Sequence, residues 1–103
     1  MHLGDLTIET AKPFEGTTFT LTLPDGVTTT MKLDEVREYA MNQRRRKATP
    51  KRAPFSLFFL GEPAMVLPQA MYTLSSEALT LTNIFLVPLS RDDEATEYEA
   101  VFT

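Results

Sequence analysis

The clearest pattern in the chain is an alternation of threonines with large apolar side chains in residues 17–23, which read TTFTLTL. Phe19, Leu21 and Leu23 share one face if the backbone is extended, because successive side chains of a strand point to opposite faces. Threonine adds to this signal, since its branched side chain suits a pleated backbone. The segment is therefore predicted to be a strand with one buried face.

A turn and a second alternating segment follow directly. The sequence PDG at 24–26 combines the fixed φ of proline with the conformational freedom of glycine, which is typical of a tight turn. Val27, Met31 and Leu33 then fall on one face of the segment VTTTMKL. We therefore predict a β-hairpin with its turn at PDG.

Residues 33–41 read LDEVREYAM and break the alternation, because Leu33 and Val36 are three positions apart. A short helix capped by Asp34 and a strand with a β-bulge are both compatible with this spacing. We favour the bulged strand, since a helix this short would bring few apolar side chains to a core.

Two segments in the second half of the chain are apolar on both faces. They are residues 54–61, PFSLFFLG, and residues 82–89, TNIFLVPL. This composition is typical of strands that are covered on both sides. We therefore expect their large side chains to share one core: Phe55, Leu57, Phe59, Ile84, Phe85, Leu86 and Val87.

Two further strands are expected nearer the C-terminus. Residues 72–74, YTL, follow a loop that prolines interrupt. The last run, YEAVFT, alternates Tyr98, Ala100 and Phe102 on one face, which predicts a strand that closes the sheet.

Together these segments indicate an all-β fold, a small antiparallel barrel or sandwich of about six strands connected as a meander. Residues 4–14 are expected to form a short helix or a cap over one end, with Leu6, Ile8 and Phe14 turned inward. A chain of 103 residues is long enough for one modest core. We therefore expect residues 1–103 to form a single domain.

The composition excludes several kinds of chemistry. No cysteine is present, so the chain cannot form disulfides or use a thiolate. His2 is the only histidine, which leaves a serine or threonine nucleophile without an ordinary imidazole base. The four glycines are too far apart to build a phosphate-binding loop. We therefore expect no enzymatic activity and no cofactor.

Carboxylates remain as candidate metal ligands or acid–base groups. Residues 91–99, RDDEATEYE, lack the alternating Asp/Asn pattern and the glycine of a calcium loop, so a solvent-exposed turn is the favoured interpretation. Asp34, Glu35 and Glu38 could pair for acid–base catalysis, but nothing in the sequence marks one of them as desolvated. We expect no metal site and no catalytic residue.

The charges are distributed very unevenly along the chain. Four basic and fourteen acidic residues lie outside one short segment, so most of the chain is strongly acidic although the net charge is only -4. Such a body repels phosphate almost everywhere, which argues against general nucleic-acid binding. The six remaining basic residues lie close together: Arg44, Arg45, Arg46, Lys47, Lys51 and Arg52.

Residues 42–53, which contain these six cations, have competing interpretations. The simplest is a solvated loop whose charge offsets the acidic body and keeps neighbouring strands apart. The alternatives are a docking site for an acidic surface, on a partner protein or on another copy of the chain, and a site for a polyanion. Because an acidic body and a basic segment are complementary, a head-to-tail oligomer is physically reasonable.

The N-terminus shows no export signal, since a basic region followed by an apolar region is missing. No apolar run approaches the roughly 18 residues that a membrane-spanning helix needs. We therefore expect no membrane association, and a location in the cytoplasm or in an assembled particle.

Several motifs resemble those of a family of small, uncharacterised bacterial domains. In chain order they are FEGTTFTL at 14–21, PFSLFFLG at 54–61, LPQAMYTL at 67–74, IFLVPL at 84–89 and YEAVF at 98–102. The resemblance covers nearly the whole chain, which implies one domain without an appended module. It assigns no catalytic or cofactor residues, and the basic segment departs from the family pattern.

The resemblance also implies a biological setting, in which domains of this kind are encoded near phage-tail-like collar or fibre proteins. We therefore expect a non-enzymatic structural or interaction protein, an accessory or assembly component of a phage-tail-like or fibre system. The alternative is a binding module for an acidic protein or a polyanion through residues 42–53.

Overall fold

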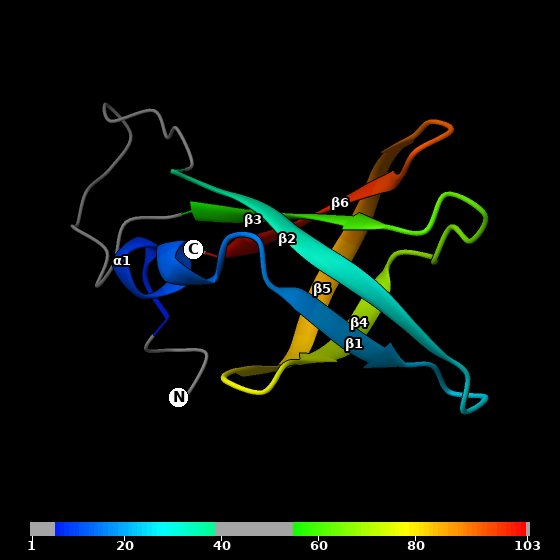
Figure 1. The fold of residues 1–103 in the computed structure, drawn as a ribbon, viewed down its shortest axis with the longest axis horizontal. Coiled ribbons are helices and arrows are strands. Elements are labelled where there is room, and N and C mark those ends of the chain that lie inside the picture. The colour runs from blue at the N-terminus through cyan, green and yellow to red at the C-terminus, as the bar shows by residue number, and fades with distance from the viewer. Residues whose placement is uncertain (1–5, 39–54, 103) are drawn as a thin grey trace, which may run out of the picture.

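Six antiparallel strands form a closed barrel with a short helical segment at one end (Figure 1). The computed structural model describes residues 6–38 and 55–102. The closed ring of six strands confirms the predicted all-β fold and shows that it is a barrel and not a sandwich. The elements in chain order are α1 (Ile8–Ala11), a 3₁₀ helix η2 (Lys12–Phe14), β1 (Thr18–Thr22), β2 (Thr28–Glu38), β3 (Phe55–Gly61), β4 (Ala70–Ser75), β5 (Thr80–Arg91) and β6 (Thr96–Phe102).

The order of strands around the barrel is β1-β2-β3-β6-β5-β4, and β4 pairs with β1 to close it. The predicted meander is therefore wrong, because a meander would place β3 beside β4. Instead β3 pairs with β6 along its whole length, from Phe55–Phe102 to Gly61–Thr96. The aromatic rings of Phe55 and Phe102 stack with centroids 5.0 Å apart, which favours this neighbour for β3.

The predicted hairpin between β1 and β2 is confirmed, with Thr22 opposite Thr28. The Oδ1 atom of Asp25 accepts a hydrogen bond from the Val27 N–H at 3.0 Å, and Gly26 takes a φ of 89° that favours glycine. Val27 itself is exposed, so the prediction that its side chain joins the apolar face is wrong. It precedes the strand and belongs to the turn.

The bulged strand predicted after Leu33 is confirmed over the described residues, while 39–41 lie outside them. Leu33 lies opposite Phe59 and Glu35 lies opposite Phe58, so Asp34 is the additional residue. The bulge shifts the phase of β2 and thereby turns Val36 into the core. Glu15 supports this geometry, because its Oε2 atom accepts a hydrogen bond from the Val36 N–H.

β5 contains two irregularities that decide which of its side chains are buried. One lies opposite the step from Tyr72 to Leu74 on β4, where Asn83 takes a positive φ of 55°. The other lies between Pro88 and Ser90. Each inserts an additional residue, bends the strand and changes its phase.

The expectation that β5 is covered on both sides is wrong, because only one face of this strand lies against the core. Ile84 and Leu86 point into the core, but the Phe85 side chain is 47% exposed and Val87 is half-buried. β3 does match the expectation, because Ser56, Leu57, Phe58 and Phe59 are all buried.

The barrel core is aromatic at its centre and aliphatic around it. Phe19 and Phe59 meet edge to face with centroids 6.0 Å apart, and both rings are fully buried. The predicted inward face of the closing strand is confirmed, since Tyr98, Ala100 and Phe102 are buried. The other large buried side chains include Leu21, Met31, Leu33, Phe55, Leu57, Leu74, Leu81 and Leu86.

The two ends of the barrel are covered in different ways. At one end lies α1, whose first turn is capped by the Thr7 side chain. In this N-terminal segment Leu6 and Ala11 are buried, and Ile8 and Phe14 pack partly buried against the core. The predicted inward positions of Leu6, Ile8 and Phe14 are therefore confirmed. At the other end the Tyr98 hydroxyl accepts a hydrogen bond from the Leu67 N–H at 2.8 Å. This bond holds the connection between β3 and β4 over the barrel.

Among residues 6–38 and 55–102, no helix has the length and apolar character that crossing a membrane requires.

We expect the change Phe59→Ala to lower the free energy of unfolding by about 3 to 5 kcal/mol, because it leaves a cavity at the centre of the core. Phe85→Ala is the matched control, since it removes the same ring from an exposed position and should cost less than about 1 kcal/mol. Urea denaturation followed by circular dichroism measures both values. Equal losses for the two variants would contradict the assignment of inner and outer faces.

Candidate interaction surfaces

The predicted partner-binding residues lie in the connection between β2 and β3, outside the described residues. These are Arg44, Arg45, Arg46, Lys47, Lys51 and Arg52. The structure does fix where this connection begins and ends, because Glu38 and Phe55 are directly opposite each other in the sheet. The basic segment therefore leaves and re-enters the barrel at adjacent positions, at the end where α1 lies (Figure 1).

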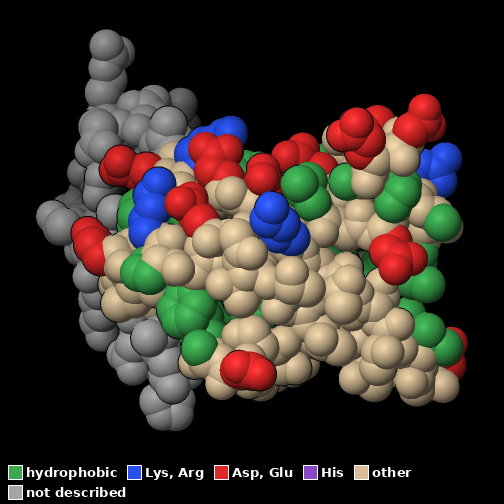
Figure 2. Space-filling view, in the orientation of Figure 1, with side chains coloured by type: hydrophobic (Ala, Val, Ile, Leu, Met, Phe, Trp, Pro, Cys, Tyr) green, Lys and Arg blue, Asp and Glu red, His purple; other side chains and the backbone are tan. Residues whose placement is uncertain are grey.

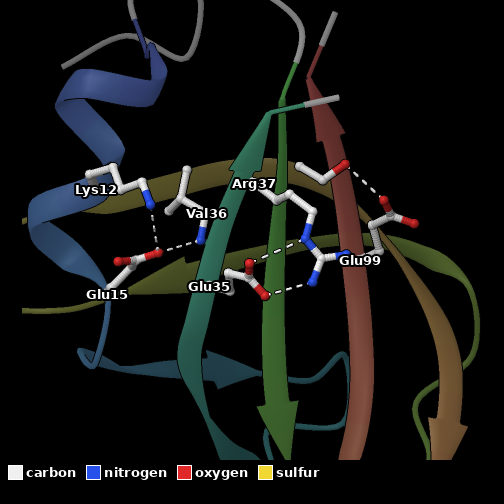
Figure 3. Close-up of polar contacts among 7 residues, drawn as sticks. Lys12, Glu15, Glu35, Val36, Arg37 and Glu99 are labelled. Atoms are coloured by element: carbon white, nitrogen blue, oxygen red, sulfur yellow. Dashed lines mark hydrogen bonds and ion pairs between the residues drawn. The ribbon is translucent and has the colours of Figure 1, made fainter. Parts of the chain in front are cut away.

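Next to this point, the outer face of β2, β3 and β6 carries an arginine in a fixed setting. The Arg37 guanidinium donates to Glu35 through Nη2 at 2.7 Å and through Nε at 3.2 Å (Figure 3). Its Cζ atom lies 4.7 Å from the centroid of the Phe58 ring. The hydrogen bonds to Arg37 lower the pKa of Glu35. The same hydrogen bonds raise the pKa of Arg37, to which the negative charges of Glu97 and Glu99 also contribute.

Glu35 is therefore a poor general acid, because its pKa is shifted away from neutrality. Of the carboxylates considered for acid–base chemistry, Asp34 occupies the bulge and Glu38 ends the strand, so the three do not form a shared desolvated site. Glu99 is held separately, since its Oε2 atom accepts a hydrogen bond from the Ser56 hydroxyl at 2.7 Å (Figure 3).

The acidic segment after β5 forms the predicted exposed turn. The Oδ1 atom of Asp92 accepts hydrogen bonds from the Glu94 N–H at 2.8 Å and the Ala95 N–H at 2.9 Å. These two backbone bonds lower the pKa of Asp92. Within the described part of the chain, no three His, Cys, Asp or Glu side chains are placed to hold a metal ion together.

Figure 2 shows how the charges gather on the face that β1 and β2 present. Carboxylates are most frequent along the upper edge and around the turn between β5 and β6, at the end away from α1, and single ones lie at the lower edge and at the end near α1. A Lys or Arg side chain lies in the central part of this face. The exposed threonines of β1 and β2 alternate here with the buried core residues.

An apolar groove of about 610 Å³ lies at the end of the barrel away from α1. It is lined by residues 22–25 of the β1–β2 hairpin and by residues 67, 68 and 70–73 of the β3–β4 connection and β4. The Tyr72 hydroxyl donates to the Pro68 carbonyl at 2.7 Å, and burial raises the pKa of Tyr72. Among the described residues of the lining, Asp25 is the only charged one.

Sequence reasoning missed this groove. Its two walls are about forty-five positions apart in the chain, and only barrel closure brings them together. The signal that could have pointed to it is the pair of prolines, Pro24 just after β1 and Pro68 just before β4, which lie among apolar residues.

A smaller apolar feature lies on the outer face of β4, β5 and β6. Met71 and Phe85 are directly opposite each other, and they share a hollow of about 170 Å³ with Val101. All three side chains are about half exposed. These exposed side chains were not predicted as a surface feature, because Phe85 was assigned to the core.

A family model described as Domain of unknown function (DUF6916) matches residues 6–102. The chain belongs to this family. The match agrees with the expected family of small uncharacterised domains, and it spans every strand of the barrel. No curated protein and no solved structure matches the chain.

We expect Asp92→Asn to weaken the dependence of stability on acid pH. A carboxyl with a lowered pKa in the folded state stabilises the fold above its unfolded pKa of about 3.8, and that contribution disappears as the pH falls through the folded value. The thermal midpoint of the parent should therefore fall more steeply than that of Asp92→Asn between pH 6 and pH 2. Asp93→Asn is the control at the neighbouring position, and parallel curves for the parent and Asp92→Asn would contradict the account.

Proposed function

We propose that this domain is a non-enzymatic interaction protein, and that it docks on an acidic protein surface through residues 42–53. The observation that carries the proposal is the separation of charge. Six basic residues and no acidic one lie between Glu38 and Phe55, while the rest of the chain has fourteen acidic and four basic residues. A partner surface with carboxylates would therefore meet one end of the barrel and be repelled elsewhere.

The length of the basic segment supports this proposal. Glu38 and Phe55 are opposite each other, so a hairpin turn of about two to five residues would be enough to connect them. Sixteen residues, 39–54, occupy that position instead. A connection longer than the fold requires is typical of segments that carry function.

Of the four cations outside residues 42–53, three are engaged within the barrel, and the fourth, Lys32, is a single exposed side chain on β2. Arg37 is already bound to Glu35 in a two-bond pair, and Lys12 lies 3.6 Å from Glu15. The guanidinium of Arg91 faces the Pro63 carbonyl at 3.4 Å. Residues 42–53 are therefore the better candidate for contacts with carboxylates, where arginine offers paired donors.

An assembly role fits this chemistry. A domain with an acidic body and a basic segment can bind copies of itself or similar subunits head to tail, and repeated contacts of this kind build rings and fibres. We therefore propose that the domain is an accessory or assembly component of a phage-tail-like or fibre system. Polyanion binding through the same segment is the second candidate, favoured only by its charge.

The test compares the parent with a variant in which the six basic residues are replaced by serine or glutamine. We expect the variant to keep its circular dichroism spectrum and melting cooperativity, because exposed charges contribute little to stability. Its association with itself or with partners retained from native lysate should weaken, and the association of the parent should weaken as salt rises. Sedimentation velocity and mass spectrometry of the retained proteins measure the two effects.

Two controls sharpen this experiment. Lys32→Gln removes an exposed cation from β2 and should change nothing. A variant with lysine at the four arginine positions keeps the charge but loses the planar donor pair, so it should show intermediate binding. Identical sedimentation and identical retained proteins for the parent and the neutralised variant at both salt concentrations would refute the proposed function, and selective retention of DNA over acidic protein would favour the polyanion.

A further inference from the structure

The seam between β1 and β4 is the shortest contact in the barrel. The two strands pair only at Thr20–Ser75 and Leu21–Leu74. Beyond this point they separate, so residues 70–73 of β4 have no strand partner on the β1 side within the described barrel. An unpaired strand edge presents backbone N–H and C=O groups that an extended polypeptide can bind.

The apolar groove described above opens where these two strands separate. Leu23, Leu67 and Met71 are among the apolar residues that line it, and Asp25 is the one charged residue among the described residues of the lining. Such a site suits a polypeptide that combines small apolar side chains with cations. A strongly acidic occupant would be opposed both by Asp25 and by the acidic body.

We propose that this groove receives the basic segment, residues 42–53, of a second copy of the chain. The inference rests on the proposed function and names its partner. In the sequence KATPKRAP, at 47–54, three cations are interleaved with alanine and proline, which complements the apolar lining and its carboxylate. The segment also carries no acidic residue that Asp25 would repel.

Distance requires the occupant to come from another copy. The segment is attached at Glu38 and Phe55, whereas the groove lies beyond the other end of β2 (Figure 1). β2 contains 11 residues and is therefore about 36 Å long. A connection of 16 residues that is fixed at both ends extends at most about 28 Å, because half of it must return.

The consequence is a heterologous, head-to-tail contact between copies. The donor surface and the receiving groove lie at opposite ends of one barrel, so every bound copy still offers a free groove or a free basic segment. Repetition of this contact gives a closed ring or an open stack. Because the two ends of the barrel differ, all copies in such an assembly would point in the same direction.

The test uses the full chain and a labelled synthetic peptide of residues 42–54 as the probe, with binding followed by fluorescence anisotropy. Asp25→Asn removes the charge but keeps an oxygen that can accept the Val27 hydrogen bond, and Met71→Ala removes part of the apolar wall. Each change should raise the dissociation constant of the peptide about three- to tenfold. The controls are Asp93→Asn, an exposed carboxylate at the same end, and Leu89→Ala, an exposed apolar side chain outside the groove.

The outcomes separate this inference from the proposed function. Weaker binding to both groove variants, with unchanged binding to both controls, supports the groove as the receiving site. Equal affinity for the parent and all variants overturns the groove, while the proposed docking of the basic segment on an acidic surface stands. No peptide binding to the parent, together with a monomer in sedimentation at high concentration, overturns the second copy as occupant, and the neutralised-segment experiment then decides the proposed function independently.

Discussion

A six-stranded sheet can close on itself only if its strands bend and stagger, and three irregularities supply the bend in this barrel. Asp34 interrupts β2, Asn83 marks the first irregularity in β5, and Leu89 lies at the second. With the sheet curved in this way, β4 reaches β1 and the ring of strands closes at Leu21 and Leu74. Burial of the two central aromatic rings depends on that closure.

Closure also determines which surfaces are available for binding. The ladder between β1 and β4 is too short to use the whole edge of β4, so an apolar groove remains at one end. Glu38 and Phe55, the described residues to which the connection with the basic segment is attached, are opposite each other at the other end. The closed barrel therefore separates the apolar groove from the attachment points of the basic segment, which lie at its two ends.

The sequence predicts those features that depend on neighbouring residues. The period of two in TTFTLTL, the turn at PDG and the three-residue step from Leu33 to Val36 correctly predict a hairpin with a bulge. Periodicity does not specify which strands become neighbours, so the pairing of β3 with β6 was missed. Phe85 was misplaced because an apolar run does not show that one of its faces stays uncovered, and the irregularity at Asn83 decides that Ile84 and Leu86 face the core instead. The groove was missed because its walls meet only after closure.

The most direct test of this account is a set of nuclear Overhauser effects between backbone protons in the full chain. We predict cross-strand effects between β1 and β4 at Leu21–Leu74, and between β3 and β6 at Phe59–Tyr98. Within residues 70–73, the amides that point away from β5 should exchange rapidly, because they have no strand partner on the β1 side. Cross-strand effects between β3 and β4, or none between β1 and β4, would contradict the closed barrel and the groove that its short seam leaves open.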